Sequence, residues 1–122
     1  MLNVKAIIPG TNDAFEFIAP EGVDISEWTM FLHFRNQLTE GDVVVIEAGP
    51  DKHEYDEETG LWQTHFDMAP ADTSQLTPTS AWVELKYCDA AGKKGYVWLG
   101  DRDGAQQIPV GYSLKDITCP EE

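Results

Sequence analysis

Hydrophobic and polar residues alternate along much of this chain, and the three-to-four-residue spacing of an amphipathic helix is missing. Successive side chains of a β-strand point to opposite faces, so a period of two predicts strands with one buried face. Residues 28–35 show the pattern most clearly. One alternate set is apolar and is expected to face a core: Trp28, Met30, Leu32 and Phe34. The other set is expected to face outward: Thr29, Phe31, His33 and Arg35.

Similar segments, each bounded by turn residues, recur along the chain. Strands are expected at 2–8, 14–18, 28–35, 42–48, 61–68, 81–88 and 96–100, and over 105–110 and 112–118 as one bent strand or two. The run DVVVIEA at 42–48 is apolar enough to be buried on both sides. We expect 51–60 and 69–80 to be connectors, the second with at most one short turn.

Seven to nine short strands with turns at near-regular spacing are typical of an all-β, antiparallel β-sandwich, either immunoglobulin-like or jelly-roll-like. The chain has 122 residues, and no linker, low-complexity block or internal repeat divides it. We therefore expect a single β-sandwich domain over residues 1–122.

Acidic residues outnumber basic ones by 22 to 8, which gives a net charge of −14. Phosphate backbones and anionic lipid surfaces attract cations, so we expect no binding to nucleic acid and no binding to a membrane. Such a charge keeps a protein dispersed in solution, and it also suits the capture of a basic partner. The first nine residues are too short for a signal peptide and lack a cleavage motif, so we expect synthesis in a cytoplasm.

The sequence contains no arrangement of residues that points to an enzyme. Of the histidines, His33 and His65 are expected to face outward from strands and His53 to lie in a turn, and no serine-nucleophile motif accompanies them. No glycine-rich phosphate loop precedes a helix, and no cofactor is expected. Cys88 and Cys119 lack metal-binding spacing, and whether they are free thiols or one bridge is left open.

Acidic turns supply weak calcium candidates, because Ca²⁺ prefers several oxygen ligands on one loop. These are Asp51, Asp56 and Glu58 on one connector and Asp101 and Asp103 on another. Neither connector completes an EF-hand loop, so solvated turns are the favoured interpretation and no metal site is expected.

Tryptophans at 28, 62, 82 and 98 raise the alternative of a carbohydrate-binding surface, but packing in the core is favoured for most of them. Trp82 differs, because it shares its face of the strand with Glu84 and Lys86. A large aromatic side chain on a polar sheet face is typical of an interface anchor. Trp82, Glu84 and Lys86 are therefore the candidate interface residues.

A series of short motifs runs from Asp13 to Gly100. They are FEF at 15–17, VDIS at 23–26, a strand over 28–35 that ends in arginine, DTSQL at 72–76, AWVEL at 81–85, Gly92, and YVWLG at 96–100. Their order resembles small β-sandwich domains of tailed bacteriophages, similar to the N-terminal module of baseplate upper proteins. The chain departs from that pattern at Val23, where a proline is usual, at Ser26-Glu27, where Thr-Gly is usual, and in an extra stretch over 101–109.

The resemblance implies a non-enzymatic bacteriophage structural protein that is made in the host cytoplasm and resides in the virion. Its partners would be other virion proteins, bound as a capsid decoration or auxiliary protein or as a baseplate or tail adaptor, and a homo-oligomer is left open. Two alternatives rest on composition instead. One is an acidic inhibitor that mimics DNA and captures a basic enzyme, and the other is a carbohydrate- or calcium-binding module.

Overall fold

The computed structural model of this chain describes residues 6–97, 99 and 104–112. This part of the chain holds eight strands: β1 (Asp13–Ile18), β2 (Thr29–Arg35), β3 (Val44–Ala48), β4 (His53–Asp56), β5 (Leu61–Met68), β6 (Thr79–Cys88), β7 (Lys94–Val97) and β8 (Gln106–Val110). A single 3-10 turn, η1 (Pro50–Lys52), precedes β4, and a four-residue helix, α1 (Pro70–Thr73), follows β5. None of the helices described is long and apolar enough to cross a membrane.

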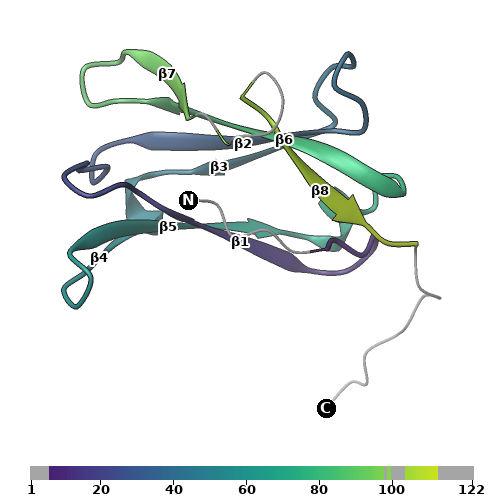
Figure 1. Ribbon diagram of the computed structural model, residues 1–122, viewed down its shortest axis with the longest axis horizontal. Coiled ribbons are helices and arrows are strands. Elements are labelled where there is room, and N and C mark those ends of the chain that lie inside the picture. The colour runs from purple at the N-terminus through teal and green to yellow at the C-terminus, as the bar shows by residue number, and fades with distance from the viewer. Residues whose placement is uncertain (1–5, 98, 100–103, 113–122) are drawn as a thin grey trace.

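The strands form two antiparallel sheets that pack face to face (Figure 1). One sheet has the order β1-β5-β4, and the other has the order β3-β2-β6-β7, with β8 also paired to β6. β7 pairs with residues 85–88 of β6 and β8 with residues 79–83, both on the edge opposite to β2. β7 and β8 therefore lie end to end along one edge. The predicted antiparallel β-sandwich is confirmed.

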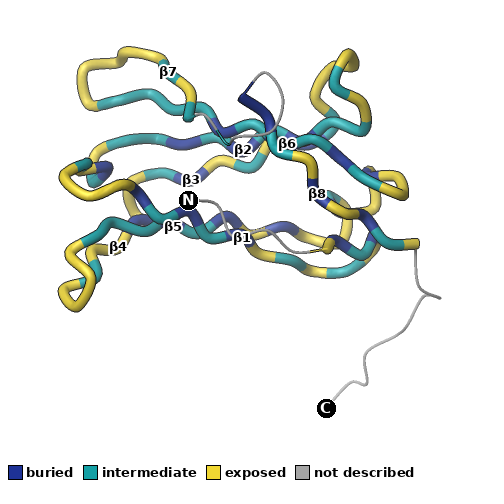
Figure 2. Tube along the Cα trace, in the orientation of Figure 1, coloured by how far each residue is buried: buried dark blue, intermediate teal, exposed yellow. Residues whose placement is uncertain are grey.

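The core lies between the two sheets, where the buried segments of Figure 2 face one another. Phe15 of β1 and Phe34 of β2 join the sheets, with ring centroids 5.6 Å apart. Met30, Leu32 and Phe34 are fully buried, as the alternation in 28–35 predicted. Removing a side chain of this size from water stabilises the fold by about 1.5–3 kcal/mol, so these inward faces hold the sandwich together.

The expectation that 42–48 is buried on both sides is wrong. β3 is an edge strand paired only with β2, and its residues alternate between buried and accessible. Val44 and Ala48 face the core, whereas 48% of Val45 is exposed. Residues 43–46 of the run are apolar, but its outer side, which also carries exposed Glu47, meets no second layer in the described part of the chain.

The expectation that 51–60 is a connector with His53 in a turn is also wrong. This segment contains η1 and β4, and His53 opens β4 with only 9% of its surface exposed. Its Nε2 lies 2.7 Å from the carbonyl oxygen of Trp28, which precedes β2. A contact between residues 25 positions apart fixes the histidine, and no local pattern signals it.

Other boundaries shift by a few residues. β6 begins at Thr79, and β7 begins at Lys94 and ends at Val97. Ile7 forms an isolated parallel bridge to Val110. Parts of the expected strands at 2–8, 96–100 and 112–118 lie outside the described residues, as does Cys119. Cys88 is a free cysteine in the structure.

Candidate protein-binding face

The three candidate interface residues lie on the outward face of the five-stranded sheet. Trp82, Glu84 and Lys86 alternate along β6 with residues that are buried in the core. In the register between β2 and β6, Arg35 lies opposite Trp82, His33 opposite Glu84, and Phe31 opposite Lys86. On the other side of β6, Tyr96 of β7 lies opposite Lys86. We call these outward side chains the β2–β6–β7 face: Phe31, His33, Arg35, Trp82, Glu84, Lys86 and Tyr96.

Aromatic side chains give this face an apolar component. Trp82 and Phe31 are half-buried, and 63% of Tyr96 is exposed, the second-highest value among the exposed large hydrophobic residues described. Neighbouring strands lie about 4.8 Å apart, so the three rings are spread over β2, β6 and β7 of one sheet face. Large aromatic groups that remain accessible on a sheet are typical of a surface that binds another molecule.

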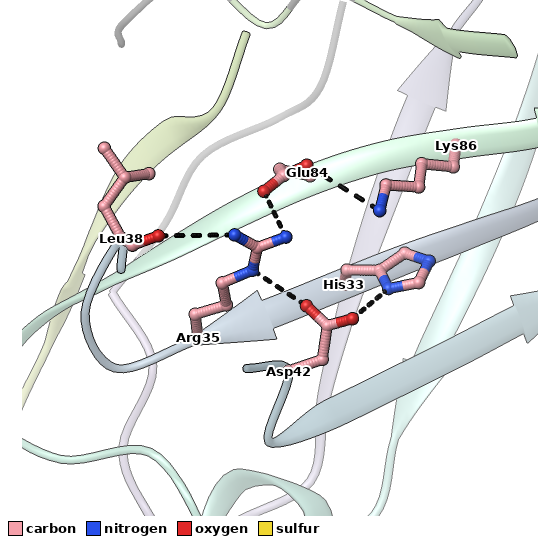
Figure 3. Close-up of polar contacts among 6 residues, drawn as sticks. All are labelled: His33, Arg35, Leu38, Asp42, Glu84 and Lys86. Atoms are coloured by element: carbon pink, nitrogen blue, oxygen red, sulfur yellow. Dashed lines mark hydrogen bonds and ion pairs between the residues drawn. The ribbon is translucent and has the colours of Figure 1, made fainter. Parts of the chain in front are cut away.

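Arg35 organises the charged part of the face (Figure 3). Its Nε lies 2.9 Å from Oδ1 of Asp42, and its Nη2 lies 2.7 Å from Oε1 of Glu84. Its Nη1 donates to the carbonyl oxygen of Leu38 at 3.3 Å. One guanidinium thus joins β2, β6 and the turn that follows β2, and its rigid fork holds both carboxylates in place.

Asp42 and Glu84 each have a second basic neighbour. Nδ1 of His33 lies 2.8 Å from Oδ2 of Asp42, and Nζ of Lys86 lies 3.9 Å from Oε2 of Glu84. Partial burial of the Asp42 carboxyl opposes its ionisation, but hydrogen bonds from His33 and Arg35 and their positive charges outweigh that effect. The pKa of Asp42 therefore lies below its ordinary value.

The paired His33 and Asp42 have the geometry of two members of a catalytic triad, but the adjoining positions hold no nucleophile. Along β2, the next outward positions are Phe31 and Arg35, and across the register lie Val45 and Glu84. None of these four side chains carries the hydroxyl or thiol that nucleophilic catalysis requires.

The calcium candidates do not come together in the described structure. Asp56 uses its own turn for hydrogen bonding: Oδ1 accepts from the backbone N–H of Glu58 at 2.9 Å, and Oδ2 accepts from Nε2 of Gln63 at 3.2 Å. Asp51 lies in η1 and is exposed. Within the described ranges, no group of three or more His, Cys, Asp or Glu residues could hold a metal ion. Asp101 and Asp103 lie outside those ranges.

Two of the other tryptophans pack against the core, as predicted. Trp28 stacks on Tyr87 with ring centroids 4.2 Å apart and planes 9° from parallel, and Trp62 lies beside Tyr55. Trp98 lies outside the described residues. Among the tryptophans that the structure describes, Trp82 is the one on the outward face of the larger sheet.

Phe31, Tyr96 and Asp42 complete this face, and the sequence analysis did not single them out. Alternation placed Phe31 on the outward side, but only the strand register brings it opposite Lys86. The register between β6 and β7 likewise brings Tyr96 opposite Lys86. Asp42 belongs to the turn before β3, and no sequence signal identifies it as the partner of Arg35.

The outward face of the smaller sheet has the opposite character. We call it the β1–β5–β4 face, and its outward positions are Ala14, Glu16, Ile18, Glu54, Asp56, Leu61, Gln63, His65 and Asp67. These positions include four carboxylates and no lysine or arginine. His65 is the single basic group there, and its Nδ1 lies 4.0 Å from Oε2 of Glu16.

No protein-family model and no curated protein matches this chain. The resemblance to phage sandwich domains therefore stays a prediction from the sequence motifs.

Proposed function

We propose that this domain is a non-catalytic structural protein that binds other proteins through the β2–β6–β7 face. The observation that carries the proposal is the combination of three partly or largely exposed aromatic rings with a pre-arranged set of charged side chains on one outward sheet surface. Trp, Tyr and Arg are the residue types that contribute most often to the binding energy of protein interfaces.

The charged side chains of this face suit a protein partner better than a small ligand. Glu84, Arg35 and Asp42 are held by one another, so their geometry needs little reordering when a partner binds. The surface is a sheet face, whereas small-molecule sites are concave and largely enclose their ligand. A sheet surface that combines aromatic side chains with arginine has the composition of a protein interface.

For the biological setting, we propose a virion component, either a capsid decoration or auxiliary protein or a baseplate or tail adaptor. The support for this narrower proposal is the order of short motifs between Asp13 and Gly100 together with the sandwich fold. Neighbouring capsid or tail genes and quantitative mass spectrometry of purified particles test it. Purified particles that lack the chain would overturn the virion setting and leave the protein-binding proposal standing.

The face itself is tested with two substitutions that remove an aromatic ring. We expect Trp82→Ser and Tyr96→Ser each to weaken binding to purified particles about 10- to 100-fold, as interface anchors do. Tyr112→Ser is the matched control, because Tyr112 is 75% exposed and follows β8 outside this face. Binding that is unchanged in both test variants, or weakened equally in the control, contradicts the proposal.

One observation favours a second candidate, an acidic inhibitor that captures a basic enzyme. The β1–β5–β4 face carries Glu16, Glu54 and Asp67 with no lysine or arginine among its outward positions. A surface that mimics DNA needs negative charge along one side. Inhibition of a nuclease that disappears at high salt, and that Glu16→Gln together with Asp67→Asn abolishes, would support this candidate.

A further inference from the structure

Positive charge is unevenly distributed over this acidic molecule. The basic residues of the described part, histidine apart, are Arg35, Lys52, Lys86, Lys93 and Lys94. All except Lys52 belong to the larger sheet or to its β6–β7 hairpin. Lys94 lies opposite Cys88, which puts it on the same outward side as Lys86 and Tyr96. Figure 1 shows that this sheet and the carboxylate-bearing one form opposite sides of the sandwich.

The lysines on this side remain available to a partner. Lys93 and Lys94 are exposed, and neither forms an ion pair with another described residue. Lys86 lies 3.9 Å from Glu84, but the other oxygen of Glu84 is already bound to Arg35. The ammonium groups of Lys86 and Lys94, on the same outward side as the accessible ring of Tyr96, would therefore bind a surface that offers carboxylates and some apolar area.

The β1–β5–β4 face of the same chain is such a surface. Glu16 lies two positions from Ile18 on β1, and Asp56 lies opposite Leu61, so carboxylates adjoin both of these half-buried apolar side chains. The adjoining β4–β5 turn adds two exposed carboxylates, Glu57 and Glu58. The lysines at the β6–β7 edge of the larger sheet are therefore opposite in charge to these carboxylates. Glu47 at the β3 edge of the same sheet is an exposed carboxylate, and the chain as a whole carries −14.

We infer that a second copy of this chain occupies the β2–β6–β7 face and presents its β1–β5–β4 face to it. The inference rests on the proposed function, because it assumes that the β2–β6–β7 face is a protein-binding surface. The two contacting surfaces differ, so the interface is heterologous, and each copy keeps one face free for the next. Such an interface closes into a ring or extends as a stack, which places many copies in one assembly.

Salt screens the repulsion between two acidic chains more than it screens the contacts at the interface. The screening length is about 8 Å at physiological ionic strength, so charges on the far sides of two sandwiches hardly interact. Lysine and carboxylate groups in contact lie well within that length. Interfaces of standard size bury about 800 Å² on each partner, and one sheet face is near the lower end, so we expect weak, concentration-dependent association.

The test is sedimentation velocity over a range of protein concentrations at physiological salt, with charge reversals on each face. Lys86→Glu with Lys94→Glu reverses the lysines, and Glu16→Lys with Glu54→Lys reverses the opposite face. Lys52→Glu is the control, because Lys52 lies in η1 and on neither face. We expect the wild type and the control to associate and each double variant alone to sediment as a monomer, with at least about a 10-fold weaker association.

Mixing the two double variants keeps the test informative even if a variant folds poorly. Each interface in the mixture is complementary again, so we expect an equimolar mixture to recover association. A double variant that still associates alone, or a mixture that fails to recover, overturns the inference. A wild type that stays monomeric at all concentrations also overturns the inference of self-association. The proposed function is decided by a separate measurement, the dependence of particle binding on Tyr96.

Discussion

Arg35 of β2 and Glu84 of β6 lie diagonally across the larger sheet, with Nη2 of the arginine 2.7 Å from Oε1 of the glutamate. The same guanidinium binds Asp42 at 2.9 Å, so a single side chain is paired with two carboxylates on this surface. Without this pairing, the two acids would repel an acidic partner. With it, the lysines and aromatic rings define how the β2–β6–β7 face interacts.

Loss of the Arg35 guanidinium should destabilise the fold. Arg35→Ala leaves Asp42 and Glu84 without their shared cation, and both carboxylates are roughly three-quarters covered. We expect the free energy of unfolding to fall by about 1–2 kcal/mol, since partial exposure limits the contribution of each ion pair. Urea denaturation measures this free energy of unfolding. The control Lys52→Ala should change it by less than about 0.5 kcal/mol.

The lowered pKa of Asp42 predicts acid sensitivity. Partial burial opposes ionisation of this carboxyl, but hydrogen bonds and charge from His33 and Arg35 prevail, so its pKa in the folded state is below the ordinary value of 3.8. The ionised carboxyl therefore stabilises the fold above about pH 4, and this contribution is lost as the pH falls through the lower folded-state pKa.

Asp42→Asn tests this pH dependence. We expect the variant to be less stable than the wild type at neutral pH and the difference to shrink below about pH 4, measured as urea midpoints over that range. Asp67→Asn, on the opposite face, controls for the loss of one negative charge. A difference between wild type and Asp42→Asn that stays constant with pH would contradict the role assigned to this carboxyl.

Gly95 leaves room for a stacked aromatic pair. A Cβ atom at this position would lie 2.5 Å from Cζ of Tyr87, whose ring stacks on Trp28. Gly95→Ala should therefore displace the tyrosine, reduce stability by about 1–3 kcal/mol and alter the near-ultraviolet circular dichroism of the pair. Gly41→Ala is the control, because its Cβ would meet no atom within 4 Å. In a Tyr87→Leu background the cost of Gly95→Ala should be smaller, and an unchanged cost would rule out this mechanism.

The hydroxyl of Thr73 joins α1 to the segment before β1. It is buried, accepts from the backbone N–H of Gly10 at 3.1 Å and donates to the carbonyl oxygen of Thr11 at 2.6 Å. Thr73→Val keeps the shape but leaves both backbone groups without this partner. We expect a loss of about 1–3 kcal/mol in thermal or urea unfolding. Thr77→Val, at an exposed position, should have little effect, and equal losses in the two variants would refute the argument.

Local alternation predicted the strands whose two faces differ in polarity. Residues 28–35 and 81–88 show this best, because one face packs on the core and the other meets solvent. It failed for β3, where Val45 is apolar like its inward neighbours but lies with Glu47 on the outer side, which no second layer of described residues covers. It failed for β4 as well, because four residues rich in charge give no period, and a distant carbonyl group at Trp28 fixes His53.

The same limit applies to the binding face. Alternation placed Trp82, Glu84 and Lys86 on one outward side, and the structure has them there. The other residues of the β2–β6–β7 face are brought beside these three by strand register. Strand register depends on the whole topology and is not visible in a local pattern. Phe31 and Tyr96 flank Lys86 from two other strands, and Asp42 reaches Arg35 from a turn. The separation of charge between the sheets is likewise visible only in three dimensions.

The most direct test of the central claim is hydroxyl-radical footprinting of the domain, free and within the particles that contain it. The method reports the solvent access of aromatic side chains, and the free protein provides the reference. We expect strong protection of Tyr96 and Trp82 in the assembly and unchanged labelling of Tyr112. Labelling of Tyr96 and Trp82 that is the same in the free and assembled states would show that the β2–β6–β7 face is not the binding surface.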